Sequence, residues 1–529
     1  MRVDYGSHSP MSVLRLHAAL RSFFCMEVSR RCRIFLVLSS FVAYVVIAVC
    51  QVLVSWDFLF NVHRWMSSDL GYVVSVLDPI LNGMSIYRDV FWNYGPFQIL
   101  FIRFIDGFFS NLFMSVVFTN LFFSACAVSI VLSYVRSLGG FLVGFLLMLL
   151  LCYPLERFSQ VNWASPLFLL YFLIYPVFKI RKDLLFLVLF FLLSVFLQLI
   201  KPTSPLLLFP FLVTRAFQAD SCVVFGKYMI IIFVAGGVLF CLLLSPFYGG
   251  YEVFLNVNLP LYMVGHYEAY GGSPISLIKA MDLGTFYNKF SVIFYSFLLG
   301  CGACFRRRFA NEDSLISFLF VLSGLISILL YFKHSGHHVN NTFPFFIAAI
   351  LINPPLGRVH ACLWWAFISL SLLLAIKLNV TSCVSSQKAF PGALNVSENS
   401  NFLLDNDIAV VELRGVLSKH SVKNAAFITK RPGLPVILGV ENNLHVKWLL
   451  YGFVSHYNSH RFWGEFWGAD WVILEKSGSY QGPEQHLASW DMGFKKKYGL
   501  FRAKLHASKL SSYSIVYESP SYYLLKRSL

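Results

Sequence analysis

Residues 68–96 read SDLGYVVSVLDPILNGMSIYRDVFWNYGP and lie directly after the first long hydrophobic run of the chain. Asp69 near the start, an apolar run up to Leu81 and a stop signal at Gly83 predict a helix of roughly 13 residues. Such a helix is too short to cross a bilayer and suits its interface. Because a helix N-terminus stabilises negative charge, Asp69 is expected to be ionised and able to accept a proton.

A loop and a second short helix follow. The loop contains Tyr87-Arg88-Asp89 and closes at Tyr94-Gly95-Pro96. Asp89 has two open interpretations: it orients a substrate or the loop, or it pairs with Arg88 or caps a turn. Pro96 suits the first turn of a helix. Five apolar residues then recur at helical spacing, namely Phe97, Leu100, Phe101, Phe104 and Phe108. We expect the helix near 96–110 to lie along the membrane interface as well.

This ordered set resembles the first exoplasmic loop of the membrane-embedded GT-C glycosyltransferases. That superfamily includes protein O-mannosyltransferases, aminoarabinose transferases and bacterial lipopolysaccharide glycosyltransferases, which use lipid-phosphate sugars. Its members commonly show an acid, a short helix ending in L-x-G, a Y-x-D sequence and a Gly-Pro or Pro-Pro pair. The corresponding elements here are Asp69, Leu81-Asn82-Gly83, Tyr87-Arg88-Asp89 and Gly95-Pro96. Many members carry Asp-Glu at the first acid, whereas this chain has Asp69-Leu70. No cofactor is indicated, and the use of a divalent metal stays open.

The composition is that of a polytopic α-helical membrane protein. Hydrophobic residues make up 57% and charged residues 13% of the 529 residues, and the mean hydropathy is +0.66. Soluble domains carry about 25% charged residues. We therefore expect a GT-C-like transmembrane domain at 34–378 with about eleven spans. The expected spans lie near 34–54, 112–135, 138–154, 163–178, 184–200, 204–217, 228–247, 287–305, 314–332, 341–356 and 361–378.

Basic residues set the expected orientation. The basic N-terminus, 1–33, is placed in the cytoplasm. The strongest basic clusters in short loops, Lys179–Lys182 and Arg306–Arg308, then fall on the same side. Eleven spans put the C-terminal tail on the exoplasmic face. The net charge of +16 is thus explained by topology and by contact with anionic lipid headgroups, not by nucleic-acid binding.

Residues 379–529 are expected to form a soluble exoplasmic domain of α/β type. Apolar runs shorten to strand length and are separated by polar and turn residues. Strands are predicted at 425–428, 435–438, 471–474 and 513–517. Helical patterns occur near 402–419 and 443–457.

Several basic residues at the outer face are candidate substrate contacts, in addition to Tyr87 and Arg88. Lys201, between two hydrophobic runs, either extends to the membrane surface or contacts an anion. Arg157 either pairs with Glu156 at the surface or contacts a lipid phosphate. Another cluster follows the ninth span and consists of Lys333, His334, His337 and His338. It either contacts a phosphate or sugar or forms a solvated loop. Zinc binding is disfavoured because no acid lies nearby.

The resemblance implies an inverting glycosyltransferase of the bacterial inner membrane. It would use a polyprenyl-phosphate sugar donor and a lipid, glycan or protein acceptor of the cell envelope. Asp69 would be the general base and Asp89 would orient the acceptor or the loop. The competing interpretations are a polysaccharide or lipid transporter, flippase or polymerase, and a non-catalytic membrane scaffold. Transporters usually carry charges inside several spans, whereas most charges here lie at span ends.

The basic clusters generate a topology prediction. Reporter fusions after residues 181 and 400 should report opposite sides of the membrane, with residue 181 in the cytoplasm, because positive loops are retained there. A reporter active on one side only, such as alkaline phosphatase, measures this directly. Two fusions that report the same side would contradict the eleven-span arrangement.

Overall fold

The computed structural model describes residues 29–54, 68–90, 92, 95–135, 141, 144–145, 164–201, 204–245, 312–334, 345, 348–349, 352, 408–447, 459–476, 479–490 and 503–528. The expected spans near 287–305 and 361–378 lie outside these residues. Those near 138–154 and 341–356 are described only at isolated positions. The tail segment 379–407 also lies outside.

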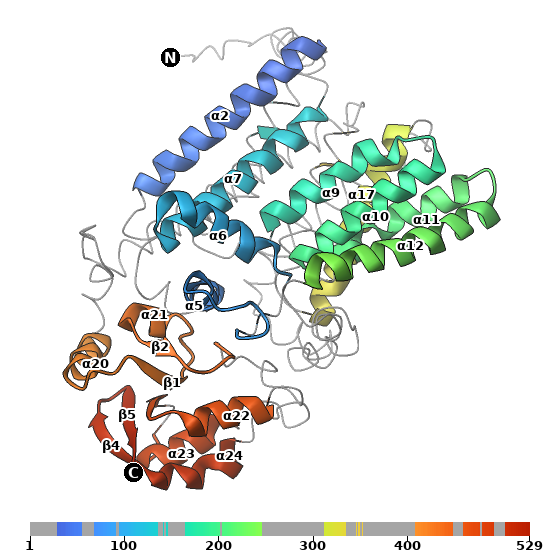
Figure 1. The fold of residues 1–529 in the computed structure, drawn as a ribbon. Coiled ribbons are helices and arrows are strands. Elements are labelled where there is room, and N and C mark those ends of the chain that lie inside the picture. The colour runs from blue at the N-terminus through green and yellow to red at the C-terminus, as the bar shows by residue number, and fades with distance from the viewer. Residues whose placement is uncertain are drawn as a thin grey trace, which may run out of the picture.

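The first half of the described chain is helical (Figure 1). Its long helices are α2 (Arg30–Val54), α7 (Leu112–Ser133), α9 (Ala164–Phe178), α10 (Asp183–Ile200), α12 (Cys222–Leu244) and α17 (Glu312–His334). Helix α7 packs against α2 and α9, and α10 packs against α9 and α12. Within the described residues, four segments are long and apolar enough to cross a membrane: Arg31–Cys50, Met114–Ser133, Asp183–Ile200 and Cys222–Leu243. These segments confirm the prediction of an integral membrane protein.

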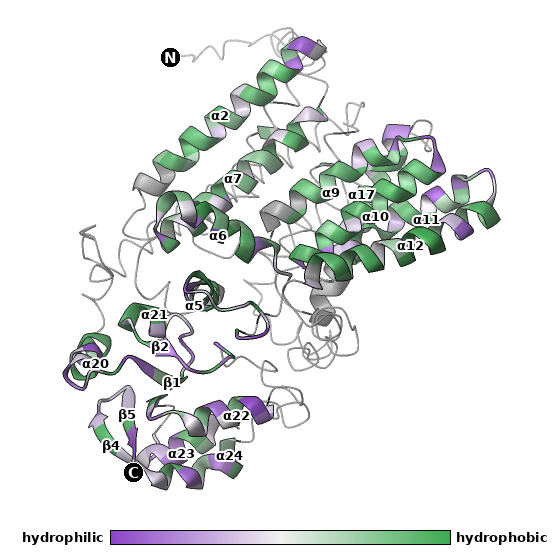
Figure 2. Ribbon diagram, viewed as in Figure 1, coloured by the Kyte–Doolittle hydropathy of each residue, from purple (hydrophilic) through white to green (hydrophobic). Residues whose placement is uncertain are grey.

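The long helices are largely apolar along their length (Figure 2). On α12, Ile230, Ile231 and Phe233 are each more than 60% exposed. Such a surface would be unfavourable in water but matches lipid acyl chains. The exposed apolar side chains therefore have a physical explanation in the bilayer.

The span expected at 204–217 is not one continuous helix. The chain forms a 3-10 helix η3 (Ser204–Leu208) and then α11 (Phe209–Gln218). Pro210 lies at the start of α11, where the missing N–H of proline is tolerated. A ten-residue helix rises about 15 Å, roughly half of the hydrocarbon thickness. Counting apolar residues could not detect this break.

The two short helices predicted around the 68–96 stretch are both present. Helix α5 spans Ser68–Leu81 and α6 spans Phe97–Phe109. Helix α5 packs against α6 and α7 on one side and against the short helix α21 (Leu434–Leu438) on the other. All residues from 71 to 80 except Asp78 are buried. Helix α5 is thus enclosed between the membrane helices and the C-terminal region, and has no solvated face along these residues (Figure 1).

The C-terminal region contains a five-stranded mixed sheet in the order β2-β1-β3-β5-β4. Its strands are β1 (Asn424–Ile428), β2 (Glu441–Asn442), β3 (Trp471–Glu475), β4 (Tyr513–Glu518) and β5 (Tyr522–Arg527). Strand β1 is parallel to β2 and β3, whereas β5 is antiparallel to β3 and β4. The surrounding helices are α20 (Ile408–Lys419), α22 (Ser459–Gly468), α23 (Gly482–Ser489), α24 (Ala503–His506) and η9 (Ala507–Ser512). The strands predicted at 425–428, 471–474 and 513–517 are confirmed.

Two predictions in this region are wrong. The run 435–438 forms α21 instead of a strand. Gly439 ends this helix in the left-handed conformation at φ 66°, and Pro435 has no N–H for a strand ladder. The helix predicted at 443–457 does not form at 443–447, and its remainder lies outside the described residues. The Asn442 side chain instead accepts a hydrogen bond from Leu444 N, which turns the chain locally.

Gly95 generates a stability prediction, because it lies against the backbone of α10. A Cβ atom at this position would lie 1.9 Å from the Leu199 carbonyl oxygen and 2.1 Å from its carbon. Backbone atoms cannot move aside as a flexible side chain does, so we expect Gly95→Ala to lower the thermal unfolding temperature of the purified protein sharply.

Gly107→Ala is the matched control. Gly107 lies within α6, and a Cβ there would meet nothing within 4 Å. Alanine favours a helix over glycine by up to about 1 kcal/mol, so this variant should be neutral or slightly stabilised. Equal unfolding temperatures for the two variants would contradict the close approach at Gly95.

Candidate functional site

The C-terminal end of α5 determines where the following loop begins. Gly83 N donates to Ile80 O at 3.2 Å, and Met84 N donates to Pro79 O at 3.0 Å. Gly83 has φ 95°, a conformation that glycine adopts readily. These bonds form a Schellman motif, so the stop signal predicted at Gly83 is confirmed.

The loop from Ser85 to Val90, called the 85–90 loop below, is closed by its own hydrogen bonds. Asp89 Oδ2 accepts from Ser85 N at 2.8 Å, and Asp89 N donates to Ser85 O at 3.0 Å. Arg88 N donates to Ile86 O at 2.9 Å around Tyr87, which has φ 70°. A positive φ is strained for a bulky residue and persists only where surrounding contacts impose it.

Asp89 is used as a structural acceptor in this loop. Arg88 donates to both of its carboxylate oxygens at 3.1 Å. These hydrogen bonds, more than any other interaction, hold the pKa of Asp89 below its ordinary value. A carboxylate with a lowered pKa and occupied oxygens is a poor proton acceptor. Of the two interpretations of Asp89, the geometry favours pairing with Arg88 and closing the turn.

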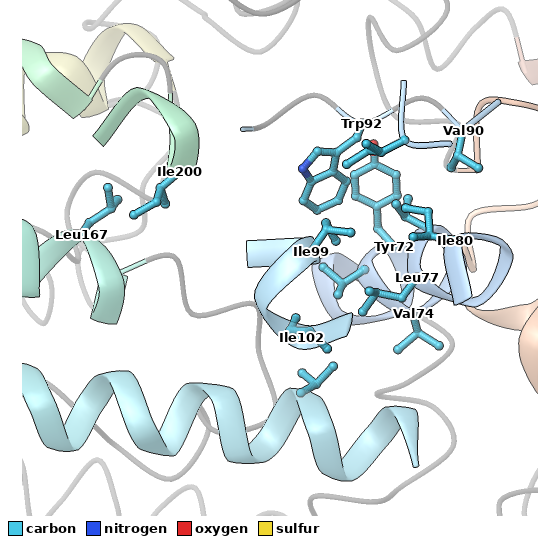
Figure 3. Packing of buried hydrophobic residues seen from close by; sticks show 14 of the residues in the cluster. Tyr72, Val74, Leu77, Ile80, Val90, Trp92, Ile99, Ile102, Leu167 and Ile200 are labelled. Carbon is cyan, nitrogen blue, oxygen red and sulfur yellow. The ribbon is translucent and has the colours of Figure 1, made fainter. Parts of the chain in front are cut away.

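An aromatic pair connects α5 to the end of the loop (Figure 3). The rings of Tyr72 and Trp92 lie 5.0 Å apart, and both side chains are buried. Trp92 Nε1 donates to Gly95 O at 3.0 Å, and Gly95 N donates to Ile200 O at 3.1 Å. Four residues thus link α5 to the C-terminal end of α10.

Lys201 lies directly after this contact. Its backbone N–H caps α10 by donating to Leu197 O at 2.8 Å, and its side chain is only 4% exposed. Tyr87 packs against a small cluster formed by Val195, Leu199 and Phe240 near the same end of α10. A cation buried at the end of a membrane helix is costly without anionic or polar partners. The end of α10 therefore gathers Tyr87, Gly95 and Lys201.

The predicted site residues divide into three groups. The structure brings Tyr87, Arg88, Asp89 and Lys201 to one region. Asp69 lies in the first turn of α5, one turn before Tyr72, and Lys333 and His334 lie at the end of α17; the side chains of all three fall outside the described positions. Arg157, His337 and His338 lie outside the described residues. Helix α17 packs against η3, the turn that follows Lys201.

The C-terminal region also contacts the 85–90 loop. Arg461 on α22 donates from Nη1 to Arg88 O at 2.6 Å. Glu465, one turn later, accepts from Arg461 Nε at 2.7 Å and from His445 N at 2.7 Å. Burial raises the pKa of Glu465, but the hydrogen bonds from His445 and Arg461 and the nearby charge of His445 together outweigh it, and the pKa lies below its ordinary value. Glu465 therefore stays ionised and holds Arg461 in place.

Two oppositely charged residues that influence each other, Asp78 and Lys447, lie beside this contact, where α5 meets the C-terminal region. Burial raises the pKa of Asp78 on α5, and the nearby charge of Lys447 offsets part of the rise. Burial lowers the pKa of Lys447 to about 8, although the negative charges of Glu441, Glu465 and Asp78 act to raise it. Lys447 Nζ donates to Asn442 O at 2.6 Å. Both shifts show that the charged forms are poorly solvated at this contact.

Several of these residues carry no recognisable signal in the local sequence. Trp92 and Tyr72 looked like ordinary aromatics, although a tryptophan three residues before a buried glycine suits a side-chain-to-backbone contact. Arg461 lies 373 residues from Arg88, so no local pattern could pair them. Among the described residues, no group of three or more His, Cys, Asp and Glu could hold a metal ion.

Comparison with known proteins gives a likeness of fold alone. The sequence matches no protein-family model and no curated protein. The structure is similar to the crystal structure of ArnT from Cupriavidus metallidurans bound to undecaprenyl phosphate. The chain shares the ArnT fold. The TM-score is 0.55 at 9% sequence identity, and the match covers 91% of this chain and 98% of ArnT. The match extends over nearly the whole of both chains and shows a shared fold.

Lys447 generates a pH prediction. Its pKa is about 8 in the folded protein and about 10.4 in an unfolded chain. The stability that it contributes is present above the unfolded pKa and is lost as the pH falls through the folded pKa. Between pH 7 and 9, its contribution should raise the free energy of unfolding by about 1 kcal/mol.

The measurement is thermal or denaturant unfolding of the parent and of Lys447→Met at both pH values. Other groups titrate in this range, so the informative quantity is the difference between the two slopes. Lys447→Met should lose the rise assigned to the lysine. Parallel slopes for the two proteins would contradict the assignment.

Proposed function

We propose that this chain is an inverting glycosyltransferase of the bacterial inner membrane. It transfers a sugar from a polyprenyl-phosphate donor to a lipid, glycan or protein acceptor of the cell envelope, on the exoplasmic face. The membrane helices and the shared fold with ArnT support this class. The ArnT structure holds undecaprenyl phosphate, which supports a polyprenyl phosphate as the lipid carrier.

One observation carries the proposal: the contacts from Tyr72 through Trp92 and Gly95 to Ile200. They join the helix that carries Asp69 to the residue that precedes Lys201. The proposed transfer requires a base and a cation at one site. The base must act on the acceptor, while the cation must act on the anionic leaving group.

The transfer is a single displacement at the anomeric carbon. Asp69 accepts the proton of the acceptor hydroxyl as its oxygen bonds to that carbon. The bond from the anomeric carbon to the phosphate oxygen breaks, and its electron pair leaves with the polyprenyl phosphate. Lys201 stabilises the charge that develops on this phosphate, with Arg157 and the 333–338 cluster as further candidates. Configuration inverts because the acceptor attacks from the face opposite the phosphate.

Asp89 has a supporting role in this mechanism. Its two oxygens accept hydrogen bonds from Arg88 and Ser85, and its pKa is lowered. We assign it to holding Tyr87 and Arg88 toward the substrate. The proposed base is Asp69, which lies in the first turn of α5, where a helix start favours the ionised form that can accept a proton.

The distribution of charge argues against the transporter, flippase or polymerase interpretation. In the four apolar segments, the charged residues lie in the first turns: Arg31 and Arg33 in α2, Asp183 in α10 and Lys227 in α12. Transport pathways usually place charges near the middle of spans. The described spans lack that feature.

The decisive prediction concerns Asp69. Asp69→Asn keeps the size and much of the helix-capping ability but removes the basicity. We expect near-normal expression and membrane insertion with transfer reduced by at least about a hundredfold. Mass spectrometry of envelope lipids and glycans with and without the protein identifies the product, and its rate of formation is then measured in proteoliposomes.

Lys201→Ala and Asp89→Asn serve as comparisons. Lys201→Ala should weaken donor binding more than it changes the unfolding temperature, because its proposed role is to contact the donor phosphate. Asp89→Asn should act partly through stability, since it loosens the 85–90 loop. Parent-like transfer by Asp69→Asn would refute the mechanism. The absence of any transfer in the parent would favour the transporter or scaffold interpretation.

A further inference from the structure

The 85–90 loop receives a hydrogen bond from the C-terminal region. Arg461 Nη1 lies 2.6 Å from the carbonyl oxygen of Arg88. Guanidinium-to-carbonyl hydrogen bonds are charge-assisted and stronger than neutral ones. This bond ends on the residue between Tyr87 and Asp89, so it acts on the centre of the loop.

The backbone at this point needs support from outside the loop. Tyr87 has φ 70°, and the turn around it is closed by Arg88 N and Ile86 O at 2.9 Å. A three-residue turn with a positive φ at its centre is rare and strained. Arg461 binds the carbonyl group of the next residue and thereby opposes relaxation of this turn.

Arg461 is itself held by a network of ionised and buried groups. Glu465 Oε1 accepts from its Nε at 2.7 Å, while Oε2 accepts from the backbone and lies 2.7 Å from the Nδ1 of His445. The His445 side chain is only 4% exposed, whereas that of Arg461 is 47% exposed. The network is thus buried at His445 and accessible at Arg461, and Arg461 contacts the 85–90 loop.

Docking of the C-terminal region does not depend on Arg461 alone. Helix α21 packs on α5, and Lys447 lies near Asp78 of α5. Removal of the Arg461 side chain should therefore leave the region docked and change only the loop. This separation makes the role of Arg461 measurable.

We propose that Arg461 is a positioning residue, which holds Tyr87, Arg88 and Asp89 in the conformation that sugar transfer requires. The inference rests on the proposed function and extends it, because it gives the C-terminal region a role in positioning residues of the transfer site. Arg461 does not touch the reacting atoms in this proposal. It acts through the Arg88 carbonyl.

The test compares three variants of the full-length protein in lipid nanodiscs. Arg461→Met keeps an unbranched apolar stem but removes the donor, and Arg461→Lys retains a cationic donor. Arg414→Met is the matched control, because Arg414 lies on α20 of the same region and makes no described contact with the loop. Hydrogen exchange at the amides of Tyr87, Asp89 and Val90 reports the loop directly, since these amides donate within it.

The expected results differ between the variants. Arg461→Met should speed exchange at these amides and lower the kcat of transfer about tenfold, with a smaller change in KM and an unchanged unfolding temperature. Arg461→Lys should recover much of the loss, and Arg414→Met should match the parent. Unchanged exchange in Arg461→Met would overturn the proposal, as would faster exchange with parent-like kcat.

Failure of the proposed function is distinguishable from failure of this inference. If the parent transfers no sugar, the proposed glycosyltransferase activity fails. The exchange measurement then decides the Arg461 contact by itself: faster exchange in Arg461→Met supports it, and unchanged exchange overturns it.

Discussion

The arrangement of the molecule depends on the burial of one short helix. Helix α5 is enclosed by α6 and α7 on one side and α21 on the other, and every residue from 71 to 80 except Asp78 is buried. A helix that is apolar around its circumference is stable only when it is covered on all sides. The membrane helices cannot cover α5 alone, so the C-terminal region has a structural reason to dock there. The candidate site lies where these two parts meet.

Two contacts of different kinds hold the candidate site. Gly95 touches the α10 backbone so closely that a single methyl group would not fit, which fixes the end of the loop against the membrane helices. The Arg461–Arg88 contact is a polar bond with a half-exposed donor. Steric contacts in a packed core hardly respond to conditions, whereas exposed charged contacts respond to salt and pH. The contact of this segment with the membrane helices is therefore rigid, whereas its contact with the C-terminal region can respond to salt and pH.

Local sequence predicted the parts of the site but not their assembly. Helical spacing and the Gly83 stop signal located α5, and Pro96 with the phenylalanine repeat located α6. The strand predicted at 435–438 was wrong because four apolar residues fit a buried strand and a short helix equally well. The continuous span predicted at 204–217 was wrong because hydropathy reports how apolar a segment is and not its hydrogen-bonding pattern. The Arg461–Arg88 hydrogen bond and the electrostatic interaction of Lys447 with Asp78 join residues hundreds of positions apart, and only tertiary packing brings them together.

The loop geometry also explains how two acids in one short segment can have different chemistry. Asp89 lies in a turn where Arg88 and Ser85 donate to its oxygens, so its proton affinity is low and its lone pairs are occupied. For Asp69, which lies in the first turn of α5, a helix start favours the ionised form, the form that the proposed function requires. Environment and not residue type separates a structural carboxylate from a proton acceptor. The two cations also differ in environment: Arg88 is exposed and pairs with Asp89, whereas Lys201 is buried at the end of α10. In the proposed function, Lys201 would contact the anionic lipid phosphate.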